Sequence, residues 1–162
     1  MPLQTTTSRL WKRLSPDERL AAANAFFKEP SPEVVGMALG AIVRARHMRP
    51  QAARALAPEA QARILATVLD PGETLASSLL VSLHLAERRP LLGAFLDAVG
   101  LPHENGVLKE EDEGAPLEET QVRKGLEALA AFPPSQVETY LNTLWLQDPE
   151  RWGVLPKMMD GA

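Results

Sequence analysis

The segment from Thr74 to Arg88, TLASSLLVSLHLAER, limits the fold of this chain more than any other. Wound as an α-helix, it is apolar around most of its circumference, and only Ser77, His84 and Arg88 form a narrow polar sector. A helix that is apolar nearly all round is buried rather than lying on a surface. At about 15 residues it is too short to cross a bilayer. The segment therefore predicts the central core helix of a helical domain.

The composition indicates a core of aliphatic residues on helices. Hydrophobic residues make up 45% of the chain and aromatic residues only 5%, so Leu, Ala and Val must supply most of the core. Ala and Leu are strong helix formers. The chain shows no sustained alternation of apolar and polar residues and no hairpin pairs, so we expect no strands. The predicted fold class is all-α, a compact irregular bundle of about seven or eight short helices around the helix at 74–88.

The 14 prolines mark helix starts rather than breaks. Four of them follow a capping side chain, at Ser15-Pro16, Ser31-Pro32, Asp70-Pro71 and Asp148-Pro149. A cap oxygen satisfies a free backbone N–H, and proline at the first helical position gives up a donor that would be unused. Ser135 and Glu138 also have the spacing of a capping box. We expect helices at 8–14, 16–28, 32–48, 50–70 with an interruption near Pro58, 74–88, 90–99, 118–132 and 135–147. The helix at 90–99 is expected to end at Gly100 and to bury Leu91, Leu92, Phe95, Leu96 and Val99.

Two packing predictions follow for the early helices. The helix at 16–28 is expected to bury Leu20, Ala23 and Phe27, which share one face. Gly36 and Gly40 lie one turn apart in the next helix, where each glycine costs about 1 kcal/mol relative to alanine. We therefore expect a neighbouring helix to approach closely at these two glycines.

A faint repeat with a period of about 40 residues gives an alternative arrangement. Two four-residue sets correspond when the chain is shifted by this period: Glu33, Leu39, Arg49 and Pro50 fall on Glu73, Leu79, Arg89 and Pro90. Such a period is typical of paired-helix repeats of the HEAT or armadillo type. Stacked helix pairs therefore remain the alternative to an irregular bundle.

The length suits a single domain over residues 1–162. Residues 1–7 and 155–162 are expected to fray at its ends, and residues 101–117 to form an irregular acidic loop with a turn at Asn105-Gly106. The net charge of −4 is unevenly spread. Residues 1–54 hold nine Lys and Arg against four Asp and Glu, a net of +5, and the remainder carries −9. Such asymmetry indicates a partner-binding face or two regions that attract each other, within a molecule or across a weak homo-oligomer.

His84, Glu87, Asp97, His103 and Glu104 are the candidates for a metal or acid–base site. Helical bundles build metal sites from inward Glu and His side chains. The carboxylate-bundle signature, however, is Glu-x-x-His on two helices, and here the order is reversed and occurs once. We therefore interpret His84 as a hydrogen-bonded residue at the edge of the core and His103 as a loop residue. A small metal- or ligand-binding enzyme is the alternative.

A basic cluster consists of Arg44, Arg46, His47, Arg49 and Arg54. A basic patch can bind phosphate or nucleic acid. The chain as a whole is negatively charged, and no aromatic residue interleaves the cluster. These features disfavour nucleic acid and favour a solvated helix end, where cations complement the helix dipole. A nucleic-acid accessory protein is the second alternative, and the four arginines are the predicted partner-binding residues.

The sequence contains no motif for a nucleophilic, phosphate-binding, thiolate or calcium site. Ser77, Ser78 and Ser82 lack a Gly-x-Ser-x-Gly turn, and no phosphate-binding glycine loop is present. The absence of cysteine excludes disulfides and thiolate metal sites. The acidic segment Glu104–Glu119 lacks the pattern of an EF-hand. The predicted function is a non-enzymatic protein–protein interaction domain, an adaptor, regulator or subunit, with no cofactor and with an unknown protein as partner. Without a signal or membrane segment, it is expected to be cytoplasmic.

Overall fold

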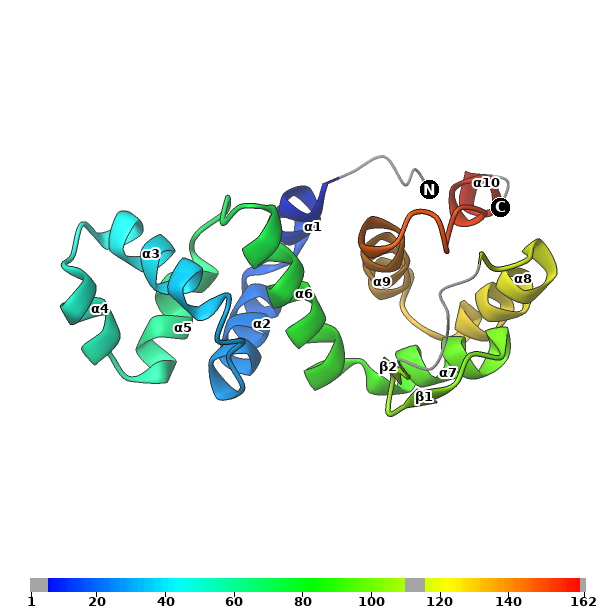
Figure 1. Ribbon diagram of the computed structural model, residues 1–162, viewed down its shortest axis with the longest axis horizontal. Helices are drawn as coiled ribbons and strands as arrows, with labels where there is room; N and C mark the ends of the chain where they lie inside the picture. Colours follow the sequence, from blue (N-terminus) through cyan, green and yellow to red (C-terminus); the bar gives the residue numbers. More distant parts are fainter. Residues whose placement is uncertain (1–5, 110–115, 161–162) are drawn as a thin grey trace. The chain divides into compact units, whose positions relative to one another are not determined.

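The computed structural model describes residues 6–109 and 116–160. These residues form ten α-helices, one 3-10 helix and one short antiparallel hairpin, which confirms the all-α fold class (Figure 1). The chain divides into two compact units, Thr6–Ala86 and a second unit from Glu87 onward. We call them the N-terminal and the C-terminal unit and describe each by itself. The single domain over residues 1–162 stays a prediction.

The N-terminal unit consists of helices that follow one another closely. They are α1 (Thr7–Arg13), α2 (Pro16–Lys28), α3 (Val35–Arg46), α4 (Pro50–Ala55), α5 (Pro58–Ala66) and α6 (Glu73–Glu87). Helix α2 runs beside α5, and α3 packs against both α4 and α5. The expected interruption near Pro58 is the short link between α4 and α5, and proline stands at the start of both helices.

Helix starts in this unit follow the predicted capping only in part. Ser15 and Glu18 form a reciprocal capping box, with Ser15 Oγ accepting from the Glu18 N–H at 3.1 Å. Residues 32–34 form a turn instead, so α3 begins at Val35. Helix α6 begins only at Glu73, because Gly72 has a left-handed backbone with φ of 88° that cannot continue a helix. Local cap chemistry thus predicted the start of α2, but only the neighbourhood of the starts of α3 and α6.

Side chains tie the N-terminal end of this unit to the segment before α6. The Trp11 indole N–H donates to the carbonyl of Val68 at 2.7 Å, and Arg19 donates to the carbonyl of Ala66 at 3.2 Å. The Glu73 carboxylate accepts the backbone N–H of Thr7 at 2.9 Å. The expectation that residues 1–7 fray is therefore wrong for Thr7, which is buried in α1; residues 1–5 lie outside the described residues.

The central helix predicted at 74–88 is α6, and its burial is confirmed. Its buried residues are Leu75, Ala76, Leu79, Leu80, Leu83 and His84. His84 is only 2% exposed and Arg88, directly beyond the helix, 5%, so two members of the polar sector are buried as well. The prediction of the buried face of α2 is wrong by one position. Helix α2 buries Ala22, Ala23 and Phe26, whereas the predicted Leu20 and Phe27 are half-buried.

The close helix approach expected at Gly36 and Gly40 is wrong. A Cβ atom placed on Gly36 would meet nothing within 4 Å, and one on Gly40 would meet only a guanidinium nitrogen of Arg44 at 3.4 Å. The buried face of α3 is the opposite one, with Ala38, Ala41 and Ile42. The glycine stripe therefore faces outward, and only Arg44 lies near it.

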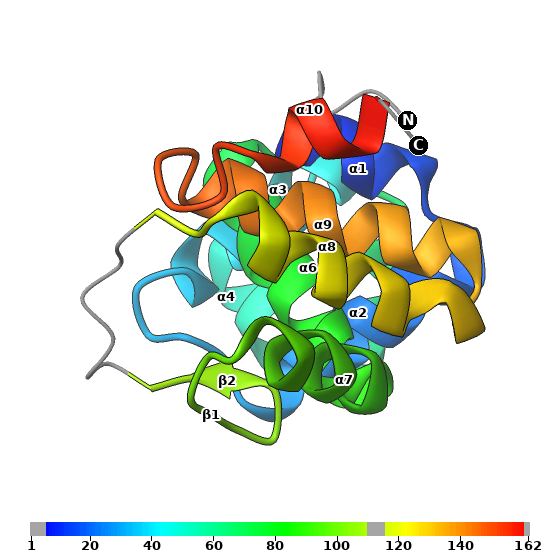
Figure 2. The same ribbon diagram turned by 90° about the vertical axis from the view of Figure 1, so that its right-hand side faces the viewer.

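The C-terminal unit begins with α7 (Arg89–Val99), whose five predicted inward residues, Leu91, Leu92, Phe95, Leu96 and Val99, are all buried. Gly100 ends this helix with φ of 81°, as the sequence predicts. The remaining elements are β1 (His103–Glu104), β2 (Val107–Leu108), α8 (Glu119–Ala128), a 3-10 helix (Leu129–Ala131), α9 (Pro134–Gln147) and α10 (Leu155–Asp160). Figure 2 shows α7 beside the hairpin and below α8.

Aromatic rings and a glycine organise the core of this unit. The Phe95 ring lies 5.6 Å from that of Trp152 and 5.7 Å from that of Tyr140, measured between ring centroids. Helix α8 packs along α7 at Gly125, where a Cβ atom would come within 2.6 Å of both Phe95 and Val99. Here a glycine does permit close helix approach, at a position that the sequence analysis did not single out.

Three predictions for this unit need correction. The Ser135 capping box does not form, because Pro133 precedes α9 as its cap and Ser135 lies inside the helix. The end expected to fray from residue 155 forms α10, with Leu155 fully buried and Met159 5% exposed. Asn105-Gly106 makes the expected turn, yet it joins two strands of two residues each where no strand was expected. Strands this short are held by the turn and leave no alternating pattern to detect.

Among the described residues, no helix is long and apolar enough to cross a membrane.

Candidate functional site

The strongest candidate for a functional surface lies where α3 ends and α4 begins. We define the arginine surface as Arg44, Arg46, His47, Arg49 and Arg54, all of which are exposed. Arg44 and Arg46 belong to the last turn of α3, Arg49 caps α4, and Arg54 belongs to its last turn. Helices α3 and α4 contact each other (Figure 1). Arg44, Arg46 and Arg49 flank the turn between the two helices, whereas Arg54 lies at the other end of α4.

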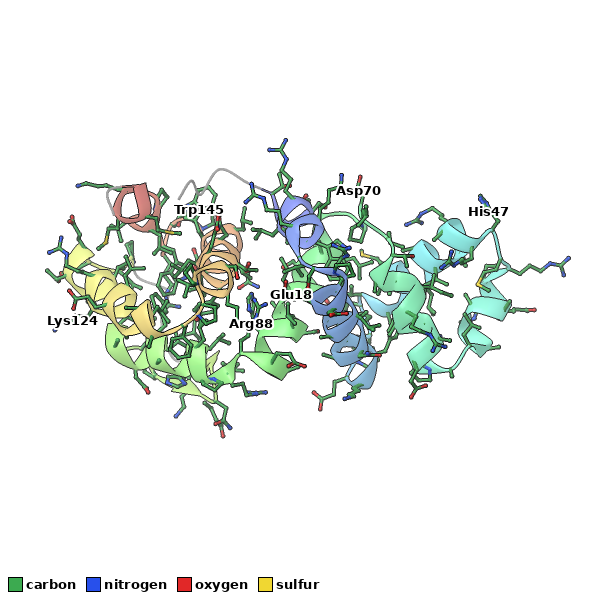
Figure 3. All side chains as sticks on the ribbon, turned by 180° about the vertical axis from the view of Figure 1, so that it is seen from behind. Glu18, His47, Asp70, Arg88, Lys124 and Trp145 are labelled. Carbon is green, nitrogen blue, oxygen red and sulfur yellow. The ribbon has the colours of Figure 1, made fainter. Side chains whose placement is uncertain are left out.

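The local sequence produces this arrangement through a sharp turn. His47 ends α3 in the left-handed conformation, with φ of 51°, and Met48 donates its N–H to the carbonyl of Val43 at 3.3 Å. Pro50 then starts α4 directly, because its fixed φ suits a first helical position. Figure 3 labels His47 at this turn. The turn thus leaves only two residues between Arg46 in α3 and Arg49 at the start of α4.

The arginine surface carries a concentrated positive charge. Residues 34–66 contain five Arg and a single Glu, a net of +4 in a chain whose total is −4. Within the described part of the chain, none of the four guanidinium groups of the surface forms an ion pair. Cations near the carboxyl end of a helix complement its dipole, which accounts for Arg44, Arg46 and Arg54 but not for Arg49. Because none of these exposed groups is ion-paired within the described part of the chain, their charge is open to a partner.

Of the candidate metal or acid–base residues, the structure brings together Asp97 and His103. The His103 Nε2 lies 2.6 Å from Asp97 Oδ1, and the Gly106 backbone N–H donates to His103 Nδ1 at 3.1 Å. Because Nδ1 accepts a hydrogen bond, the proton of the neutral ring is on Nε2, which donates to the carboxylate. Asp97 is held in the last turn of α7, and His103 begins β1.

This pair acts as a structural clasp between α7 and the hairpin. A general base or a metal ligand needs a ring nitrogen with a free lone pair, and both nitrogens of His103 already have partners. Glu104 is exposed on β1 and Glu87 is exposed at the end of α6. Among the described residues, no three His, Asp or Glu side chains are grouped so that they could hold a metal ion. His84 belongs to the N-terminal unit, so it is not placed relative to the clasp.

Several buried polar residues were not expected from the sequence. Thr143, Asn142 and Arg151 are each 7% exposed or less. The Asn142 and Thr143 side chains donate to carbonyl groups one turn earlier in α9, as short polar side chains in helices often do. Burial raises the pKa of the Tyr140 phenol well above its usual range. No local sequence pattern marks Asn142, Thr143 or Arg151 as buried, because only tertiary packing decides which surface is covered.

The uneven charge predicts that oppositely charged regions attract each other, and for the arginine surface and the acidic segment Glu104–Glu119 this stays a prediction. Residues 110–115 of that segment lie outside the described residues. In comparisons of the chain with models of protein families, with curated proteins and with solved structures, nothing matches, so the chain is assigned to no family.

Proposed function

We propose that this protein is a helical protein–protein interaction module, and that the arginine surface is where it binds an acidic partner protein. The observation that carries the proposal is the set of four exposed arginines on two packed helices, α3 and α4, with no ion pair of their own among the described residues. Like charges gathered in one region of a protein oppose folding by mutual repulsion. A partner of opposite charge turns that repulsion into attraction and steers the encounter.

The residue types support a carboxylate-bearing protein as the partner. All four cations are Arg rather than Lys, and a guanidinium can form two parallel hydrogen bonds to one carboxylate. Arg is also enriched at protein interfaces, from which Lys is depleted. A guanidinium can bind a phosphate group through the same pair of hydrogen bonds. However, no aromatic side chain lies in the cluster to stack on a base.

The enzyme alternative has less support. Its pair of contacting residues, Asp97 and His103, has both imidazole nitrogens occupied by hydrogen bonds. Catalysis by this histidine would first require the hairpin turn to release the Gly106 N–H.

A capture experiment with two charge-matched variants tests the proposal. The first variant carries Arg44→Gln, Arg46→Gln, Arg49→Gln and Arg54→Gln. The control carries Arg9→Gln, Lys12→Gln, Lys28→Gln and Lys124→Gln, which remove the same charge from exposed positions elsewhere. Each protein is used to capture binders from an extract of the source cells, with and without nuclease, and bound proteins are identified by mass spectrometry and cross-linking.

We expect a protein that the parent and the control retain, that the arginine variant loses, and that added salt releases. Its cross-links should fall on α3 and α4. Equal loss in both variants would show that only total charge matters. Loss of all binding after nuclease treatment would replace the proposal with the nucleic-acid alternative.

A further inference from the structure

The Asn105-Gly106 turn of the hairpin contains the reactants of a covalent self-modification. Asn105 is exposed, and the residue after it has no side chain to hinder attack by its backbone nitrogen. The chain has two other asparagines, Asn24 and Asn142, and these are followed by Ala and Thr within helices. An Asn-Gly step is therefore present at one place in the sequence, and it forms the turn between β1 and β2, where Asn105 is exposed.

The chemistry is deamidation through a succinimide. The Gly106 backbone nitrogen loses its proton to a base and forms a bond to the side-chain carbonyl carbon of Asn105. The bond between that carbon and the amide nitrogen breaks, and the nitrogen takes up a proton and leaves as ammonia. Water then opens the five-membered ring on one side or the other, which gives aspartate or isoaspartate. Water is the only co-reactant, and no oxidation or reduction takes place.

The closed hairpin opposes this attack by its backbone conformation. Asn105 has φ of 51°, in the left-handed region, and Gly106 has φ of 88°, as a two-residue type I′ turn requires. In the left-handed region ψ is near +47°, which turns the following nitrogen away from Cβ and hence away from the side-chain carbonyl carbon. The nitrogen that must attack is therefore on the wrong side of the Asn105 Cα.

The same nitrogen is also held by the clasp. The Gly106 N–H donates to His103 Nδ1, while Asp97 fixes the imidazole from its other side at 2.6 Å. Two further contacts keep the turn on α7: Arg89 donates to the carbonyl of Asn105, and Gly106 lies so close to Leu92 that a Cβ atom would be 2.9 Å from the leucine Cβ. Attack thus requires the turn to leave α7 and Asn105 to leave the left-handed region.

We propose that Asn105 is a deamidation site whose rate is set by opening of the hairpin, with the Asp97–His103 clasp as its latch. Each opening that allows attack can convert Asn105 irreversibly. The product carries an additional negative charge close to Asp97 and Glu104. Isoaspartate also adds a methylene group to the backbone, which the two-residue turn cannot accommodate. Modification therefore favours the open hairpin. Because the reaction is irreversible, the modified residue 105 remains after the opening that allowed the attack.

The test follows the purified full-length protein during incubation at neutral pH. Peptide mapping by mass spectrometry measures aspartate and isoaspartate at residue 105 in the native parent, in the parent unfolded in urea, and in a His103→Ala variant. An Asn105→Gln variant is the control for modification elsewhere in the chain. Hydrogen exchange of the Gly106 amide in the parent measures opening directly and does not depend on whether a variant folds.

We expect the unfolded parent to deamidate at least tenfold faster than the native parent. The His103→Ala variant should be about two- to tenfold faster than the native parent, as loss of one hydrogen bond in the closed state implies. Equal rates in native and unfolded parent would overturn the proposal. Slower modification in His103→Ala would also overturn it, because His103 would then be acting as the base that accepts the Gly106 proton.

Discussion

The Glu73 carboxylate lies 2.9 Å from the backbone N–H of Thr7 and 3.3 Å from that of Ser8, so the first residue of α6 satisfies free donors at the start of α1. Thr6 caps the same helix by accepting the Arg9 N–H at 3.2 Å. The two ends lie 66 residues apart in sequence, and the contact joins the beginning of the N-terminal unit to its last helix.

Partial burial raises the pKa of Glu73, but the hydrogen bonds from Ser8 and Thr7 together outweigh it and lower the pKa below its usual value of 4.5. The folded state therefore binds this proton less readily than the unfolded state. The stabilisation is complete above the usual pKa and is lost as pH falls through the lowered value. We expect Glu73→Gln to reduce stability at neutral pH and to flatten its decline in acid. Thermal melts over a pH series, with Glu59→Gln as an exposed control, measure this; parallel curves for parent and Glu73→Gln would contradict it.

Leu79 is the core position with the clearest expected cost. It is fully buried in α6, so Leu79→Ala leaves a cavity and should lower the free energy of unfolding by about 2–5 kcal/mol. Leu69→Ala provides the comparison, because Leu69 is 44% exposed. Urea denaturation of both variants gives the two values. A Leu79 variant no less stable than the Leu69 variant would be incompatible with α6 as a core helix.

Gly36→Ala should stabilise the protein. The added methyl group meets nothing within 4 Å, and alanine loses less conformational freedom in a helix than glycine does. The expected gain is about 0.5–1 kcal/mol in the free energy of unfolding. Chemical denaturation of the purified variant measures it. A loss of stability of that size would mean that another surface covers this face of α3 in solution.

Gly125→Ala should have the opposite effect. Its methyl group would lie 2.6 Å from atoms of both Phe95 and Val99, which are themselves buried, so the helices must move apart. Overpacking of this kind lowers the free energy of unfolding by about 1–3 kcal/mol. This loss exceeds the gain from the higher helix propensity of alanine. Chemical denaturation of the Gly125→Ala and Gly36→Ala variants under the same conditions compares their free energies of unfolding. If both variants gained stability, the packing of α7 on α8 would have to be looser than described.

The sequence by itself determined the fold class, the position of most helices and the character of α6. Helix starts depend on the few residues around them, and a proline such as Pro16 or Pro50 acts through its own ring and missing N–H. The inward face of α7 was predicted in full, because its apolar residues form a single stripe with no competing alternative. The exposure of the arginine surface likewise follows from the cost of burying unpaired charges.

Only the tertiary structure decided which of several similar surfaces is covered. Gly36 and Gly125 look alike in sequence, yet one faces outward and the other lies against Phe95, because close approach depends on a neighbour that local sequence does not specify. Asp97 and His103 were both singled out, but their pairing needed the Gly106 N–H to engage one ring nitrogen and leave the other for Asp97. Backbone preferences act over a few residues and can be read from the chain. Packing partners are set by the arrangement of whole helices, which the chain reaches only on folding.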